Sequence, residues 1–391
     1  MNSRLRQTFS AFFLRISDLL SIIAAPAATS FVKLLRPTSV EFRRAYDDLF
    51  TIIQPHKDVS HKISHRLTNL DDYPFLRDLL SPFRIRPAHL LVLPNGEVCG
   101  SRGAEITDTG VLVPDEFPGR SFSRDDLRLI KRSRVLRARR AGQVCSLLDP
   151  YCHNYFHWFL DVLPRLRELE RFELISGARA DLLVPGWMTP WQQSSLRMLA
   201  PERNWIRHSA RHGLFRLKAD QLLVPSTARF NAEVGAPFAA MNPEICVWLR
   251  DSFRNAAGIK TAEGDLRIFV SRKLASSRRI LNEEEIFELL QHHHFHSVCL
   301  EEMSFNEQLR LFARASHVIA AHGSGLTNLL FSNRPKVLEL FASGHGIRSD
   351  YFQICLALGH NYHPIVCPSE NGKNDFRIDL NQLCQALLPK S

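Results

Sequence analysis

The chain has 391 residues, 45% of them hydrophobic and 23% charged, a balance that excludes a disordered tail and predicts a globular protein of two or three domains. Fifty Lys and Arg against forty Asp and Glu give a net charge of +10, which indicates polyanionic partners such as nucleotide phosphates, anionic lipid or nucleic acid. The eight cysteines form no Cys-x-x-Cys pair, so we expect reduced, mostly buried thiols in a cytosolic protein.

Residues 1–45 form a basic and partly apolar amino-terminal segment. Arg4 and Arg6 precede the apolar stretch Leu19–Ala28, but Asp18 interrupts the run before it. The uninterrupted part is too short for a transmembrane helix, which needs about 20 residues. Two interpretations remain open: an amphipathic segment on an anionic membrane surface, or a packed amino-terminal helix.

Residues 46–240 alternate strand-like and helix-like stretches and predict an α/β domain. The segment His89–Cys99 is typical of a β-hairpin that turns at Asn95-Gly96. Two short buried strands and an intervening helix follow, at Asp181–Pro185, Asp220–Pro225 and Trp191–Leu199. Prolines and small residues are frequent in residues 226–245, where we place the boundary with a second domain of residues 241–391.

The second domain repeats strands and helices at the spacing of a doubly wound sheet, in which ligands bind at the carboxyl ends of the strands. Helices are predicted after Asn282 and after Ser304, the second with a capping box completed by Glu307. The predicted strands are Leu266–Ser271, Phe295–Leu300, Val318–Ala321 and Lys336–Phe341.

A glycine-rich turn follows the strand Val318–Ala321. Gly323 and Gly325 allow a sharp turn and a close approach of the backbone to a ligand, and the N–H groups of the following helix start are suited to a phosphate. His322 and Ser324 add side-chain donors. The alternative is a tight turn that binds nothing.

Basic residues cluster at two places. Arg272, Lys273, Arg278 and Arg279 directly follow a predicted strand, which places them near the same carboxyl ends as the glycine turn. Guanidinium groups bind phosphate oxygens in a bidentate manner, so this segment predicts a diphosphate site, although a solvated loop would have the same composition. The other cluster, Arg134–Arg140, is interpreted as a solvated face.

His157 and Asp161 are four residues apart, so on a helix they share one face and can form a hydrogen-bonded pair. A carboxylate that holds an imidazole in one tautomer makes it a workable general base. The alternative is a core histidine whose hydrogen bonds are satisfied. The tract His292–His294 lacks a carboxylate or cysteine at ligand spacing, and the chain has no Asp-x-Asp motif, so we expect no metal site.

Four segments of the chain, in this order, resemble glycosyltransferase family 61. They are Asn154–Leu166, Val270–Glu283, Leu300–Gln308 and Ala321–Asn328, and the similarity covers about residues 140–366. The resemblance implies an α/β, GT-B-like fold of two Rossmann-like domains facing a cleft, with a C-terminal helix that returns to the first domain. It also implies inverting transfer of a sugar from a nucleotide sugar, a UDP-sugar in our interpretation, with no cofactor or metal required.

The same resemblance assigns roles to the candidate residues. His157 and Asp161 would be the base and its orienting partner, with Asp161 as the base if the histidine contacts the substrate. Glu339 would accept hydrogen bonds from ribose hydroxyls, unless it is an ordinary strand-end carboxylate. The donor would be held by Arg272, Lys273, Arg278 or Arg279, His322, Gly323, Ser324, Gly325, Leu326 and Asn328.

The chain departs from the secreted members of that family because it lacks a clear signal anchor and a disulfide framework. We therefore expect a cytoplasmic enzyme of the bacterial capsule or lipopolysaccharide type, which acts on a glycan or lipid-linked acceptor and contacts the anionic inner membrane only peripherally. The alternative is a non-catalytic nucleotide- or glycan-binding scaffold with the same fold. A nucleic-acid-binding protein is the weakest interpretation, because no zinc-finger, homeodomain or RNA-recognition sequence accompanies the charge.

Overall fold

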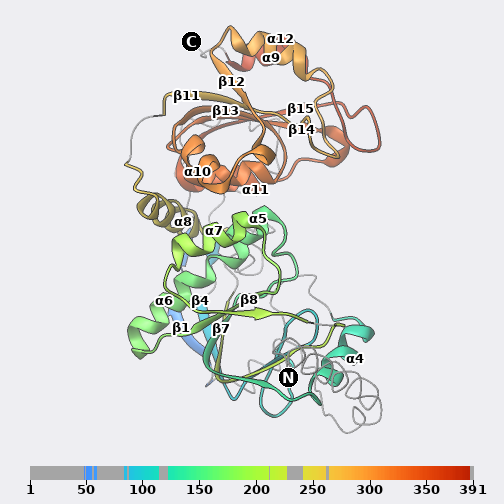
Figure 1. Ribbon diagram of the computed structural model, residues 1–391. Helices are drawn as coiled ribbons and strands as arrows, with labels where there is room; N and C mark the ends of the chain where they lie inside the picture. The colour runs from blue at the N-terminus through green and yellow to red at the C-terminus, as the bar shows by residue number, and fades with distance from the viewer. Residues whose placement is uncertain are drawn as a thin grey trace, which may run out of the picture.

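The structure of the chain is a computed structural model. It describes residues 48, 50–54, 57–59, 83–85, 88–113, 122–210, 212–226, 241–260 and 264–387. These residues form two large β-sheets, one in the lower and one in the upper half of Figure 1, with helices packed against them. The amino-terminal segment 1–45 lies outside the described residues, so both interpretations of it stay predictions.

The lower sheet combines a parallel and an antiparallel part. Its elements are β1 (Phe50–Gln54), β4 (Ala88–Pro94), β5 (Glu97–Cys99), β6 (Ala104–Ile106), β7 (Arg139–Ser146), β8 (Asp181–Pro185), β9 (Trp205–His208) and β10 (Arg216–Pro225). The strands β10, β7, β8 and β9 are neighbours in this order and run parallel, whereas β4 pairs antiparallel with β10 and β1 antiparallel with β4. Around them lie α4 (Arg124–Ser133), α5 (Tyr155–His157), α6 (Arg165–Ser176) and α7 (Pro190–Leu199).

The predicted hairpin over residues 89–99 is wrong. Both β4 and β5 pair antiparallel with the single strand β10, through Pro94 opposite Gln221 and Glu97 opposite Lys218. Asn95 takes a left-handed conformation with φ of 52°. It separates β4 from β5, which continue in the same direction along β10, whereas the sequence indicated that the chain turns back there. The physical reason is that β10 is long enough to satisfy the backbone on both sides of the interruption, which the local Asn-Gly signal does not reveal.

The upper sheet is fully parallel. Its elements are β11 (Leu266–Val270), β12 (Phe295–Val298), β13 (Ala315–Ala321), β14 (Lys336–Ala342) and β15 (Asn361–Cys367), with α9 (Glu283–Gln291), α10 (Phe305–Ala313), the 3₁₀ helix η6 (Ser324–Phe331), α11 (Asp350–Leu358) and α12 (Leu380–Leu387) around them. The strand order is β12-β11-β13-β14-β15, so β12 is added on one side of β11 and the later strands on the other side. The switch point therefore lies between β11 and β13. Such a switch point opens a crevice at the carboxyl ends of the two strands. The predicted α/β class with parallel sheets is confirmed, while the facing of two domains across a cleft stays a prediction.

The two predicted helix starts in this half differ. Ser304 caps α10 as expected, and its backbone N–H donates to the Glu307 carboxylate at 2.8 Å to complete the capping box. Asn282 precedes α9 but does not cap it. Its side chain exchanges two hydrogen bonds with the backbone of Ile378, at 3.0 and 3.1 Å, and so joins the helix start to the C-terminal part of the chain.

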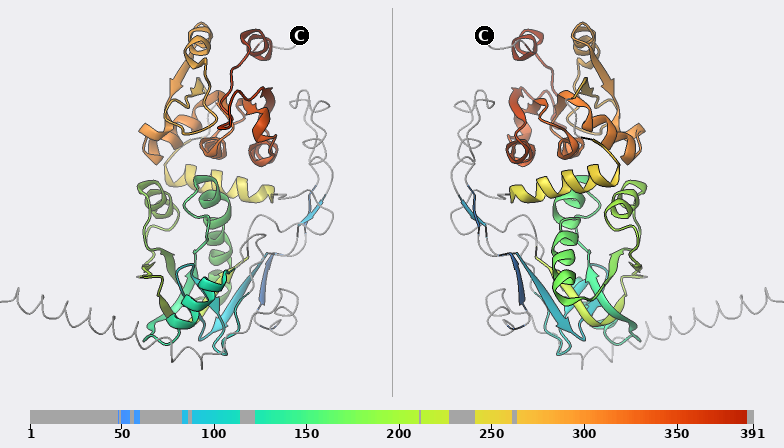
Figure 2. Two further views of the ribbon diagram at one scale, coloured as in Figure 1. Left: turned by 90° about the vertical axis from the view of Figure 1, so that its right-hand side faces the viewer. Right: turned by 90° about the vertical axis from the view of Figure 1, so that its left-hand side faces the viewer.

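A buried cluster of aromatic rings joins the two halves. Helix α8 (Pro243–Ala256) lies between the upper and lower halves in both views of Figure 2. Its residue Phe253 packs with Phe159 from the lower half and with Phe305 and Phe331 from the upper half, at centroid separations between 5.3 and 5.5 Å. All four rings are almost completely buried, so the hydrophobic core continues from one sheet to the other.

The C-terminal helix does not return to the lower half as we expected. In α12 the side chain of Leu383 is fully buried in the cluster that holds Ile286 and Leu290 of α9, and Lys336 Nζ donates to the Ala386 carbonyl at 2.7 Å. The helix lies beside α9 at the far end of the upper half (Figure 1). Within the part of the chain that the structure describes, no helix is long and apolar enough to cross a membrane.

Candidate functional site

The candidate site begins at the switch point of the upper sheet. Arg272 follows β11 and Gly323 follows β13, the two strands on either side of the switch. A side chain at Gly323 would overlap the Arg272 guanidinium. The strand order therefore brings the basic segment and the glycine turn into contact, as the sequence predicts for the carboxyl ends of adjacent strands.

Arg272 is held by its surroundings but its donors are not all used. Its backbone N–H donates to Glu283 at 3.0 Å, and its Nη2 donates to the Ser277 carbonyl at 2.8 Å. Its Nε is buried and has no hydrogen-bond partner among the described residues. Burial and then the nearby charge of Arg278 lower the pKa of Arg272 below its usual range. A half-buried guanidinium with an unused donor beside a second cation is an environment that an anion would stabilise.

The other three basic residues of this segment have different surroundings. Arg278 Nη1 lies 3.3 Å from His345 Nε2, near the glycine turn, and Lys273 is exposed with its Nζ 3.9 Å from Glu302. Arg279 donates to Asp375 at 2.8 and 3.1 Å, and these bonds lower the pKa of Asp375 to about 2. Arg279 is therefore held by a buried carboxylate instead of facing the site, and its predicted donor-binding role does not fit this geometry.

The two glycines of the turn lack a Cβ and so leave room for the side chains of neighbouring residues. Gly323 has an extended backbone with φ of 175°, so a left-handed conformation does not explain it. A side chain there would meet Arg272, and a Cβ at Gly325 would lie 2.7 Å from Leu300 Cδ1. Helix η6 starts at Ser324, which is exposed, and its first N–H groups have no acceptor inside the helix.

Asn328 and the buried Leu326 belong to the body of η6. The Leu326 N–H donates to the Gly323 carbonyl at 2.9 Å. Asn328 accepts a hydrogen bond from the Tyr155 hydroxyl at 2.7 Å, and its amide donates to Gln308 at 2.9 Å. The Asn328 side chain thus fastens α5 of the lower half to η6 of the upper half, and neither of these two side chains faces outward from the turn.

His322 forms a histidine–carboxylate pair with Glu339. Their Nδ1 and Oε1 atoms are 2.6 Å apart, and the second carboxylate oxygen accepts from the Tyr362 hydroxyl at 2.7 Å. Glu339 is fully buried, so both of its oxygens are used within the protein. The predicted contact of Glu339 with ribose hydroxyls does not fit, because the carboxylate instead orients the His322 ring. The His322 Nε2 makes no hydrogen bond to the described residues.

His157 forms the second such pair, with Asp161. Asn154 caps the helix by accepting from the N–H groups of Phe156 and His157, and the chain then continues as the π-helical turn η4 (Trp158–Val162). The predicted hydrogen bond is present, with His157 Nδ1 2.6 Å from Asp161 Oδ2. The side chain of His157 is 25% exposed, whereas that of Asp161 is fully buried. Only the histidine of this pair can reach a ligand.

A line of rings connects the two pairs. Phe156 packs edge-on against the adjacent His157 and against Tyr351 of α11, each at 5.6 Å between centroids. Tyr351 in turn lies 5.1 Å from His322, which stacks on Phe341. The structure thus brings together the three predicted segments around Arg272, His322 and His157. Sequence reasoning missed Tyr351, Tyr362 and Asp375, which belong to no recognisable motif.

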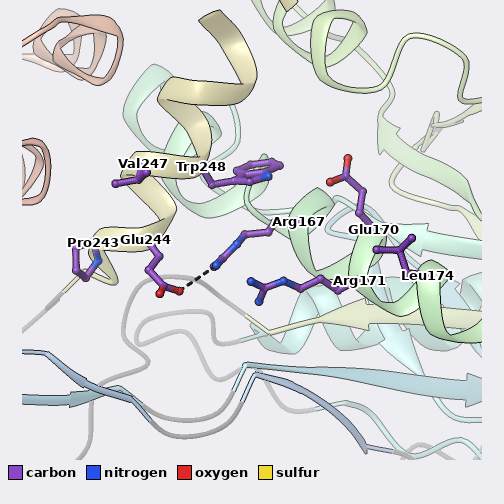
Figure 3. A pocket seen from close by; sticks show the side chains of 8 residues that line it. All are labelled: Arg167, Glu170, Arg171, Leu174, Pro243, Glu244, Val247 and Trp248. Atoms are coloured by element: carbon purple, nitrogen blue, oxygen red, sulfur yellow. Dashed lines mark hydrogen bonds and ion pairs between the residues drawn. The ribbon is translucent and has the colours of Figure 1, made fainter. Parts of the chain in front are cut away.

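A separate groove of about 530 Å³ lies between α6 and α8 (Figure 3). Arg167 and Glu244 join the two helices across it at 3.0 Å. None of the predicted site residues lines this groove. The described residues contain no cluster of three or more side chains suited to a metal ion.

Comparison with protein families gives one match: residues 155–338 fit the model described as Glycosyltransferase 61. This part of the chain is therefore similar to that family. It includes the His157 pair, Arg272 and the glycine turn, and it ends one residue before Glu339. No significant match was found among curated proteins.

Proposed function

We propose, starting from the match to Glycosyltransferase 61, that this protein is an inverting glycosyltransferase which moves a sugar from a nucleotide sugar to a hydroxyl group of an acceptor. One observation carries the proposal. The half-buried Arg272, with its unused donor, lies at the switch point of a doubly wound sheet, and rings connect that site to an accessible histidine–carboxylate pair. An anion site and a base next to each other are the two parts that such a transfer needs.

The anion site would hold the diphosphate of the donor. Arg272 and Arg278 supply positive charge, and the N–H groups at the start of η6 supply further donors. The His322 Nε2 adds another donor when the ring is protonated, because its Nδ1 faces the Glu339 carboxylate. When the bond between the anomeric carbon and the phosphate oxygen breaks, the electron pair stays on the leaving diphosphate. These fixed donors stabilise that charge as it develops.

The acceptor hydroxyl would lose its proton to His157. Asp161 is fully buried and holds His157 Nδ1, so the proton is taken at Nε2 and Asp161 stabilises the resulting imidazolium. The acceptor oxygen then bonds to the anomeric carbon from the side opposite the diphosphate, which inverts the configuration. The exposure of the two side chains thus favours His157 as the base and Asp161 as its orienting partner.

The remaining parts of the assignment extend this core. We propose a UDP-sugar as donor and a glycan or lipid-linked acceptor of surface polysaccharide synthesis. Glu339 and Tyr362 act through His322, whose ring they orient. A non-catalytic scaffold would need the anion site but not the His157–Asp161 pair, so the two hypotheses differ in what the loss of His157 would do.

Nucleotide binding by Arg272 variants tests the proposal. We expect UDP or another nucleoside diphosphate to bind the wild-type protein, and Arg272→Ala to weaken binding by about tenfold to a hundredfold, because a charge-assisted hydrogen bond contributes about 1.5–3 kcal/mol. Arg272→Lys should restore the charge but not the guanidinium fork. Arg207→Ala, which removes an exposed arginine of β9, is the control. Equal binding by Arg272→Ala and the control would show that the diphosphate site is elsewhere.

A further inference from the structure

A basic hollow lies outside the site described above, at the amino-terminal ends of β7 and β10. It has a volume of about 590 Å³ and is lined by Leu136, Arg137, Ala138, Arg140, Arg216 and Lys218. The residues Arg137 and Arg140 belong to the basic cluster that the sequence suggested to be a solvated face. Both are exposed, as that prediction requires, and they line the hollow together with two cations from another strand.

Strand pairing gathers these cations on one face of the sheet. Lys218 of β10 is paired with Arg140 of β7 on one side and with Glu97 of β5 on the other. Paired residues point to the same face, and so does Arg216, two residues before Lys218. Like charges in paired positions repel each other at a Cβ separation of about 5 Å, so this arrangement costs stability unless an opposite charge compensates it.

The one carboxylate beside these cations already has two arginine partners. Glu97 is buried, and it accepts from Arg216 Nη2 at 2.7 Å and from Arg134 Nε at 3.2 Å. The group thus has five cations, Arg134, Arg137, Arg140, Arg216 and Lys218, against one carboxylate, a surplus of four positive charges. Among the described residues, Arg137, Arg140 and Lys218 form no ion pair.

The guanidinium of Arg216 is held in place by hydrogen bonds that do not use all of its N–H groups. Its Nη1 donates to the carbonyl groups of Arg134 and Leu136, and its Nη2 to Glu97. Its Nε is buried and has no partner among the described residues. A guanidinium that is already ordered loses little conformational entropy when it binds a ligand.

The hollow is remote from the proposed transferase site. β7 begins at Arg139 beside the hollow and ends at Ser146, before the loop that leads to His157. Eight residues of strand span about 26 Å. A ligand in the hollow is therefore a different molecule, or a different part of a molecule, from the sugar donor.

We infer that this hollow binds a phosphate group, either of a soluble phosphate ester or of an anionic lipid headgroup. Several neighbouring cations with guanidinium forks match the charge and the oxygen geometry of a phosphate. The bound phosphate would also relieve the repulsion between Arg140 and Lys218. The inference does not depend on the proposed transferase activity.

Binding of inorganic pyrophosphate by the full chain, measured by calorimetry, tests the inference. The Arg272→Ala variant serves as the background, because the weakened donor site then contributes less to the measured binding. In this background, Arg137→Ser with Arg140→Ser should weaken binding by about tenfold or more, because each charge-assisted contact is strong. The matched control, Arg207→Ser with Lys260→Ser, removes two exposed cations elsewhere and should leave binding unchanged.

Sedimentation with vesicles separates the two sources of phosphate. Phosphatidylcholine vesicles with and without phosphatidylglycerol are compared for the same variants. Loss of pyrophosphate binding alone supports a soluble ligand, and loss of binding to the anionic vesicles supports a headgroup. If the hollow variant binds both probes as the matched control does, or if neither probe binds the background protein, the inference is wrong. Since arginine removal relieves repulsion, an unfolding midpoint at or above that of the control shows that the variant is folded.

Discussion

The two histidine–carboxylate pairs of this protein have the same geometry and different accessibility. In each pair a ring Nδ1 lies 2.6 Å from a fully buried carboxylate oxygen. The side chain of His157 is 25% exposed and that of His322 only 6%, and Tyr362 binds the second oxygen of Glu339. A hydrogen-bonded pair is thus compatible with two roles. The exposed ring of His157 can exchange a proton with a substrate. The buried ring of His322 is suited to the role of a hydrogen-bond donor that is held in a fixed position.

Removal of His157 should have the largest effect on activity. We expect His157→Ala to lower kcat by about 10²–10⁴-fold, the usual contribution of a general base, while the affinity for nucleotide remains near that of wild type. His153→Ala removes an exposed histidine four residues earlier and serves as the control. Sugar transfer and nucleotide binding are measured on the same preparations. If transfer by the two variants is equal, the comparison fails, and the scaffold hypothesis gains support.

This pair was predictable from the sequence because its signal is local. Spacing along one helix placed His157 against Asp161, and the capping box of α10 and the turn after β13 were readable in the same way. The partners that the sequence did not reveal are distant along the chain. Arg279 is bound by Asp375 and Glu339 by Tyr362, contacts that depend on where whole strands and loops meet. A window of sequence contains no information about such contacts, nor about the pairing of both β4 and β5 with β10.

His360 can be compared with the two histidines of these pairs, because it is a buried histidine without a carboxylate partner. Its Nε2 bonds to the Leu329 carbonyl of η6 at 2.9 Å, and burial lowers its pKa from 6.5 to about 4. The unfolded chain therefore binds more protons than the folded one between these pH values, and stability falls as the pH decreases from about 6.5 to about 4. The full shift corresponds to about 3 kcal/mol of unfolding free energy.

Urea unfolding at pH 7 and near pH 4.5 checks this expectation for His360→Gln. The variant should lose less of its free energy of unfolding over that interval than wild type, although it is less stable at pH 7. His292→Gln, at an exposed position, should behave as wild type. An equal loss in all three proteins would assign the acid sensitivity to other groups, such as His317, whose pKa is also lowered to about 4 by burial.

The contact between Gly323 and Arg272 allows a change to the anion site that leaves the His157 pair intact. In Gly323→Ala the added methyl group would displace the guanidinium. We expect nucleotide affinity to fall by roughly tenfold to a hundredfold, the cost of misplacing a binding group by about 1 Å. The double variant with Arg272→Ala should bind no worse than Arg272→Ala alone, because the group that the methyl displaces is then absent. Additive losses would mean that Gly323 acts independently of Arg272.

Glu339→Gln should have the smallest effect, and it separates a positioning role from a reacting one. The amide keeps the shape of the carboxylate but removes its charge, and its single oxygen can accept from either His322 Nδ1 or the Tyr362 hydroxyl. Because His322 would donate a hydrogen bond without taking the acceptor's proton, we expect kcat to fall by only about tenfold. A loss as large as that of His157→Ala would mean that the buried pair and not the exposed one carries the proton transfer. The two pairs differ in accessibility, so this one substitution decides whether accessibility also divides their roles.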